Sequence, residues 1–122
     1  MKGLAVRKGE RIVEQGTLST GPCCGMMLAD LGADVIKVES PDGDPYRAYQ
    51  GGNYSPHFQA YNRNKRSLAL DMKQAADRTV FDTLIREADV FIQNFRPGTA
   101  DRLGAGAKRL QELNPKLIYC SI

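Results

Sequence analysis

The chain has 122 residues, of which 42% are hydrophobic and 25% charged, and its formal net charge is +3 at pH 7. This length accommodates one domain with a hydrophobic core, and the composition is that of a globular protein rather than a disordered or fibrous one. The mild charge does not indicate a nucleic-acid partner, and no stretch is apolar enough to indicate a membrane partner. The N-terminus lacks the apolar length of a signal peptide, which favours a cytoplasmic location.

The cysteine and histidine content argues against a metal centre. Cys23, Cys24 and Cys120 lack the C-x-x-C spacing of zinc and redox sites, so we expect all three to be reduced and mostly buried. His57 is the only histidine, which leaves little material for a metal site or for a Ser-His or Cys-His dyad.

The first part of the chain predicts a strand, a helix and a second strand. The first strand covers residues 11–15, and after the loop 16–21 a helix opens at Pro22 and ends at Gly32. This helix is apolar nearly all round, so we expect it to be buried on more than one side. Residues 34–39 form the next strand, which makes a right-handed βαβ crossover the natural topology.

Residues 46–66 show no clear period but are rich in aromatic side chains. These are Tyr46, Tyr49, Tyr54, Phe58 and Tyr61. A loop of this length is uncommon inside a compact domain. It is therefore either functional or anchored on a partner subunit by its aromatic residues.

The second half of the chain continues the alternation of strands and helices. Strands are expected at residues 67–71, 90–92 and 117–122, and helices at residues 75–87, 99–103 and 108–113. The helix of residues 75–87 directs Val80, Leu84 and Ile85 toward the sheet. The pattern predicts an α/β fold with a Rossmann-like, mostly parallel sheet and flanking helices. Because the chain stops inside a predicted buried strand, we interpret it as the N-terminal piece of a longer protein.

The segment Asn94-Phe95-Arg96-Pro97-Gly98 directly follows the apolar strand of residues 90–92. In open α/β sheets, ligands bind outside the carboxyl ends of the strands, so this loop offers an amide, an aromatic ring and a guanidinium to a ligand. Lys73 and Arg102 also follow strands and converge on the same edge. Such a cluster suits a ligand with several phosphates and a purine.

Two other patterns are open to more than one interpretation. The outline of strand, loop, helix, strand and terminal Glu39 is that of a dinucleotide-binding unit, but the glycines do not fit G-x-G-x-x-G, so this evidence for a nicotinamide or flavin cofactor is weak. The basic run of residues 63–66 is either a solvated turn or part of the ligand cluster.

Several segments, in the same order, resemble the class III coenzyme A transferases of the CaiB/BaiF type. This family includes formyl-CoA transferase, carnitine and bile-acid CoA-transferases and α-methylacyl-CoA racemases. The resemblance covers residues 9–122. Its landmarks are Gly21-Pro22, residues 28–39, Gly43-Asp44-Pro45, residues 62–67, residues 94–98 and Leu113-Asn114-Pro115.

The resemblance implies that residues 1–122 are an N-terminal, Rossmann-like CoA-binding segment of a larger domain, in a homodimer whose chains interlock. The implied coenzyme A contacts fall on Ser19, Thr20, Ser40, Leu70, Asp71, Met72, Lys73, Asn94, Phe95, Arg96 and Arg102. Some members have glutamine at the position of Ser19 and arginine at that of Ser40, so this chain departs from them at both places.

The resemblance also implies a reaction between acyl-CoA and carboxylic acid substrates through an aspartyl-CoA intermediate. The family's catalytic aspartate lies downstream of Ile122, so we expect no catalytic residue in this chain and no activity from it alone. The alternatives are an acyl-CoA racemase of the same family, a non-catalytic binding or assembly module, and part of a dinucleotide-dependent oxidoreductase.

Overall fold

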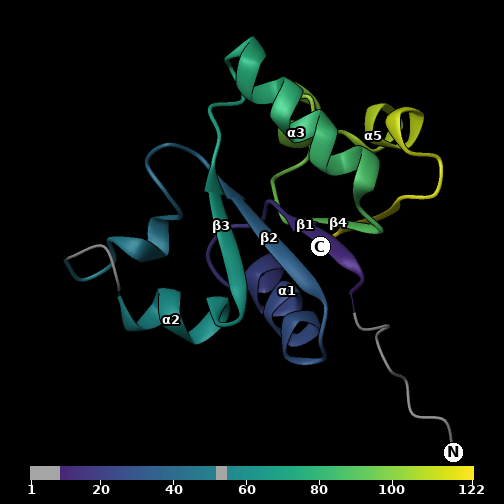
Figure 1. The fold of residues 1–122 in the computed structure, drawn as a ribbon. Coiled ribbons are helices and arrows are strands. Elements are labelled where there is room, and N and C mark those ends of the chain that lie inside the picture. The colour runs from purple at the N-terminus through teal and green to yellow at the C-terminus, as the bar shows by residue number, and fades with distance from the viewer. Residues whose placement is uncertain (1–8, 52–54) are drawn as a thin grey trace, which may run out of the picture.

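The computed structural model describes residues 9–51 and 55–122, and its centre is a five-stranded parallel sheet (Figure 1). The strands are β1 (Arg11–Glu14), β2 (Asp34–Glu39), β3 (Lys65–Ala69), β4 (Val90–Gln93) and β5 (Ile118–Ser121). Their spatial order is β3-β2-β1-β4-β5, with β1 pairing in parallel to both β2 and β4. The chain therefore builds outward from β1 in one direction and then in the other, as in a Rossmann-like α/β fold.

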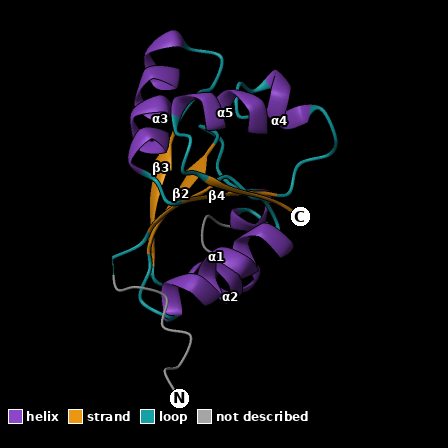
Figure 2. Cartoon of the chain, turned by 90° about the vertical axis from the view of Figure 1, so that its right-hand side faces the viewer, coloured by secondary structure: helices purple, strands orange, loops and turns teal. Residues whose placement is uncertain are grey.

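Helices cover both faces of the sheet (Figure 2). One face carries α1 (Thr20–Asp30) and α2 (Pro56–Asn62), and the other carries α3 (Ala75–Glu87), α4 (Thr99–Arg102) and α5 (Ala107–Leu113). A short 3-10 helix, η1 (Pro45–Arg47), lies in the connection between β2 and α2. No helix in the described ranges is long and apolar enough to cross a membrane.

The core has two parts because successive strand residues point to opposite faces. Val13 packs with Phe81, Ile85 and Phe91 on the α3 side, whereas Ile12 belongs to the cluster on the α1 side. The Phe81 and Phe91 rings meet edge to face, with centroids 6.0 Å apart. These fully buried aromatic residues fix α3 against the centre of the sheet.

Most element boundaries agree with the prediction, and the exceptions have local causes. α3 has the predicted bounds, and Gly32 has the left-handed φ of 104° expected after the end of α1. α1 begins at Thr20 rather than at Pro22, which makes Pro22 the third residue of the helix. Proline is tolerated there because the N–H groups of the first helical turn have no carbonyl acceptor within the helix. β3 begins at Lys65 rather than Ser67, because the Lys65 side chain is buried against Glu14 and draws the start of the basic run into the sheet.

Four further expectations need correction. The helix α3 turns Phe81 rather than Val80 toward the sheet, and Val80 is 44% exposed. Residues 46–66 are not one long loop, because they contain α2 and the end of η1; Tyr54 lies outside the described residues. The three cysteines are free but partly exposed. α1 is buried on more than one side, as predicted, because it packs against both the sheet and α2, but Met27 and Leu31 on its remaining side are exposed.

Candidate functional site

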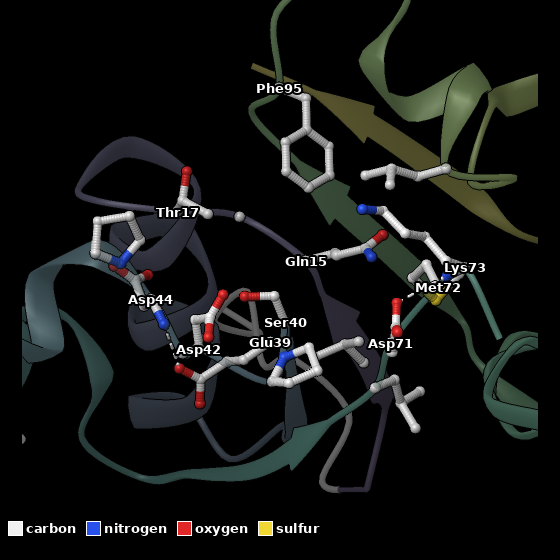
Figure 3. Close-up of a pocket in the computed structure, with 17 residues that line it drawn as sticks. Gln15, Thr17, Glu39, Ser40, Asp42, Asp44, Asp71, Met72, Lys73 and Phe95 are labelled. Atoms are coloured by element: carbon white, nitrogen blue, oxygen red, sulfur yellow. Dashed lines mark hydrogen bonds between the residues drawn. The ribbon is translucent and has the colours of Figure 1, made fainter.

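A cleft of about 600 Å³ opens at the carboxyl ends of β1 to β4 (Figure 3). Each of these strands contributes to its walls. The lining includes Gln15 to Thr17 after β1, Glu39 to Pro45 at and after the end of β2, Leu70 to Lys73 after β3, and Phe95 after β4. The chain adds β2 and β3 on one side of β1 and then β4 and β5 on the other. The cleft therefore lies at the topological switch point, where open α/β sheets bind their ligands.

The cleft brings together part of the ligand set that the sequence predicts. Ser40, Leu70, Asp71, Met72, Lys73 and Phe95 line it. The lining formed by the described residues does not include Ser19, Thr20, Asn94, Arg96 or Arg102. Within the described ranges, the Lys73 ammonium and the Arg96 guanidinium have no side-chain hydrogen bond or ion pair, so both are available to an anionic ligand. The Arg102 guanidinium donates to Thr99 Oγ1 at 2.8 Å.

Asn94 joins the loop after β4 to the loop after β1. Its Oδ1 accepts the Thr17 N–H at 2.8 Å, and its Nδ2 donates to the Thr17 carbonyl and to Thr20 Oγ1, both at 2.9 Å. The two loops also approach closely, since a Cβ added at Gly21 would lie 3.0 Å from both Gly16 Cα and Asn94 Oδ1. Asn94 and Thr20, both predicted ligand residues, therefore bond to each other in this structure and shape the loop.

Two acidic residues and two lysines form a buried cluster next to the loops that line the cleft. They are Glu14, Asp44, Lys37 and Lys65. Lys37 Nζ lies 3.0 Å from Asp44 Oδ2 and 3.4 Å from Glu14 Oε1, and it donates to the Gly16 carbonyl at 2.9 Å. Lys65 Nζ lies 3.0 Å from Glu14 Oε2 and donates to the Pro22 carbonyl at 2.7 Å. The lysines thus neutralise the acids and hold both ends of the loop between β1 and α1.

The sequence analysis did not identify this cluster, although the sequence contains an indication of it in the charged residues of two strands. Glu14 directly follows the apolar pair Ile12-Val13, and Lys37 lies between Ile36 and Val38 in the next strand. Charged residues are almost never fully buried unless they are paired. Burial lowers the pKa of Lys65, and the charge of Glu14 opposes that effect. Only the register, which pairs Glu14 with Lys37 across β1 and β2, shows that they are partners.

The Glu39 carboxylate, at the end of β2, is fully occupied by groups of the protein. It accepts two bonds of 2.7 Å from the Arg47 guanidinium, one from the Asp44 N–H at 2.9 Å and one from the Ser67 hydroxyl. Burial alone would raise the pKa of Glu39, but these hydrogen bonds outweigh it and lower the pKa to about 2. These bonds make Glu39 a structural acid at the end of β2 rather than a ribose ligand.

The basic run of residues 63–66 is not among the described residues that line the cleft, and its side chains bind acidic residues of the protein instead. Arg63 pairs with Asp30 at 2.6 Å, and Arg66 pairs with Asp34 at the same distance. Both arginines are exposed, Arg63 in the turn before β3 and Arg66 within β3. The interpretation as a solvated turn therefore holds for the start of the run only. Lys65 belongs to the buried cluster.

Gln15 and Gln93 are site residues that the sequence analysis missed. The Gln93 Oε1 accepts the Phe95 N–H at 2.7 Å, and its Nε2 donates to Ser121 Oγ at 2.8 Å. Gln93 therefore fixes the backbone of the residue whose ring lines the cleft. Nothing in the local sequence distinguishes either glutamine from an ordinary polar residue after an apolar run.

The fold and the cleft define a Rossmann-like α/β domain with a cleft at its topological switch point. Residues 8–122 match the model of CoA-transferase family III, and the chain belongs to this family.

The relatives and solved structures agree with this assignment. The chain is 44% identical over 119 residues to a succinyl-CoA:mesaconate CoA-transferase of Haloarcula hispanica, covering 92% of this chain and 30% of that protein. It is 39% identical to a formyl-CoA:oxalate CoA-transferase of Escherichia coli, covering 94% and 29%. The crystal structure of a CaiB/BaiF family protein from Brucella suis superposes with a TM-score of 0.88 at 42% identity, covering 93% and 32%. The chain thus spans about 30% of the length of the curated relatives that it matches.

Proposed function

We propose that this chain is the N-terminal CoA-binding segment of a CoA-transferase that moves CoA between an acyl-CoA donor and a carboxylic acid acceptor. The observation that carries the proposal is the cleft at the switch point, which combines the aromatic ring of Phe95 with the ammonium of Lys73, for which the described residues supply no side-chain partner. The family membership supports CoA thioesters as the ligand class. The relatives' names support transfer, rather than racemisation, as the reaction.

The proposed ligand places its charged and aromatic parts on different residues. Lys73, Arg96 and Arg102 are the cations that would hold phosphate groups through charge-assisted hydrogen bonds. Phe95 offers a face for the purine, and the loop of residues 16–20 offers backbone groups. Ser19 and Ser40, where some family members have glutamine and arginine, would give weaker contacts at those positions.

The proposed chemistry divides the work between this segment and the rest of the protein. A downstream aspartate would attack the thioester carbonyl and release CoA thiolate, giving a mixed anhydride. The thiolate would then attack the aspartyl carbonyl, giving aspartyl-CoA and the free donor acid. The thiolate must stay beside the anhydride between these steps, and this segment would retain it by binding the nucleotide end of CoA. We therefore propose that the chain alone binds CoA without turnover, and that the enzyme is a cytoplasmic homodimer.

Calorimetric titration of the purified chain with CoA and, separately, with NAD tests the proposal. We expect saturable binding of CoA and weaker or undetectable binding of NAD. Preference for NAD would favour the oxidoreductase interpretation. Stable self-association with no nucleotide affinity, in a chain folded by circular dichroism, would favour the assembly module. In the complete protein, exchange of the substrate's α-proton with solvent without acyl-group exchange would favour a racemase.

A further inference from the structure

Gln15 occupies the centre of the cleft floor. Its N–H donates to the Ile92 carbonyl at 2.9 Å, so its backbone continues the sheet beyond β1. The side chain lies two residues after Val13, and therefore on the α3 face of the sheet. It is only 6% exposed and forms part of the cleft wall, where Figure 3 shows it between Thr17, Lys73 and Phe95.

The Gln15 amide is not explained by the fold. Its Oε1 is buried and has no hydrogen-bond partner among the described residues. The neighbouring lining includes the apolar side chains of Val38, Leu70 and Met72, against which a leucine would pack without any unsatisfied group. Gln93, which ends the adjacent strand β4, has both ends of its amide bonded within the protein. Gln15 differs, because no donor among the described residues reaches its amide oxygen.

The surroundings of Gln15 indicate what would bind it. Figure 3 shows the Phe95 ring directed into the cleft toward Gln15, and Gln93 fixes the backbone of Phe95. A planar base lying against this ring would turn one edge toward the Gln15 amide. A carboxamide offers an acceptor and a donor side by side, which is the pattern that pairs with the amino group and a ring nitrogen of adenine.

We propose that Gln15 is a specificity residue that recognises the adenine edge of the bound nucleotide. Its oxygen accepts from the 6-amino group of the base, and its amide nitrogen donates to a ring nitrogen. This inference rests on the proposed function, because it assigns a role within the same CoA site. Beyond the proposed function, the inference states that the cleft recognises the adenine base of CoA as well as the phosphate groups.

The test compares CoA with an analogue in which the 6-amino group of adenine is replaced by hydrogen. The wild-type chain should bind CoA about tenfold more tightly than the analogue, as expected for one lost hydrogen bond at a buried site. In Gln15→Leu, CoA affinity should fall by a similar factor, and the two ligands should bind within about twofold of each other. Lys73→Met serves as the control, since it should weaken both ligands alike and preserve their ratio.

The outcomes separate this inference from the proposed function. Equal affinity of the wild-type chain for both ligands would overturn the role of Gln15 while leaving CoA binding intact, and this result needs no variant. A Gln15→Leu chain that retains the tenfold preference would also overturn it. Absence of CoA binding to the folded wild-type chain would overturn the proposed function and this inference together.

Discussion

Asn94 and Thr17 lie 77 residues apart in sequence, yet the Asn94 amide bonds to both backbone groups of Thr17. The amide thereby ties the loop after β1 to the loop after β4 across the switch point. Both loops border the cleft, since Thr17 and Phe95 line it. The Asn94 amide therefore holds the two walls together through contacts within the protein, in addition to the bonds that Lys37 and Gln93 make to the individual loops.

Replacing Asn94 should affect both stability and binding. Asn94→Ala leaves the Thr17 N–H and carbonyl without their partners, so we expect the free energy of unfolding to fall by about 1–3 kcal/mol. CoA affinity should also fall, because the loop after β1 loses its position. Urea denaturation and calorimetry measure the two effects.

Asn114 provides a matched control for this experiment. Its amide donates to the Ile85 and Ala88 carbonyls at 2.9 and 2.8 Å, away from the cleft. Asn114→Ala should lower stability by a similar amount and leave CoA affinity unchanged. If both variants reduced CoA affinity equally, the effect of Asn94 would be one of general stability.

Removing one charge from the buried cluster should be costly. Lys37 and its acidic partners are almost completely buried, so Lys37→Met leaves Glu14 and Asp44 with one lysine between them. We expect a loss of about 3–5 kcal/mol in the free energy of unfolding. Arg66→Met breaks an exposed ion pair with Asp34 and should cost less than about 1 kcal/mol. Equal losses in chemical denaturation would contradict this account of the cluster.

Glu39 should make the protein sensitive to acid. Its pKa is about 2 in the folded protein, below the ordinary value of 4.5. Because the folded-state pKa is the lower one, the stabilisation is fully present above pH 4.5 and is lost as the pH falls toward 2. The loss amounts to at most about 3 kcal/mol. Urea midpoints at pH 6 and pH 3 should therefore differ less in Glu39→Gln than in the wild type; an unchanged difference would contradict the assignment.

The three cations proposed to hold phosphate groups can be tested one at a time. Lys73→Ala, Arg96→Ala and Arg102→Ala should each weaken CoA binding by about 1–3 kcal/mol, and the wild-type affinity should fall as salt is added. Arg63→Ala is the control, because Arg63 pairs with Asp30 away from the cleft. Unchanged affinity in all three variants would remove the phosphate assignment.

Local patterns were sufficient to predict the order of the elements, but not the contacts that build the cleft. The apolar runs of β2 and β4 and the 3.6-residue period of α3 are local signals, and the structure confirms these elements. The pairing of Lys65 with Glu14 depends on strand register, which no short window contains. For the same reason the sequence allows two interpretations of the basic run and predicts the start of β3 two residues late.

In the candidate site, too, local sequence signals predict some residues, whereas long-range contacts determine the roles of others. The loop after β4 and Lys73 are predicted from their position after strands, and residues 70–72 only by the family resemblance. Phe95 and residues 70–73 do line the cleft. The Asn94 amide bonds to Thr17 instead, a long-range contact that its sequence context does not indicate. Gln15 was missed because its significance comes from burial without a partner, which only a three-dimensional structure reveals.

The most direct test of the central claim is to map the bound CoA by backbone amide chemical shifts in the NMR spectrum of the labelled chain. The account predicts that CoA perturbs the amides at the carboxyl ends of the strands, namely residues 15–17, 40, 42–44, 70–73 and 94–96. The amides of Arg11, Asp34 and Arg66, at the opposite edge of the sheet, should not move. Perturbations confined to that opposite edge, or none at saturating CoA, would contradict the claim that this cleft is the CoA site.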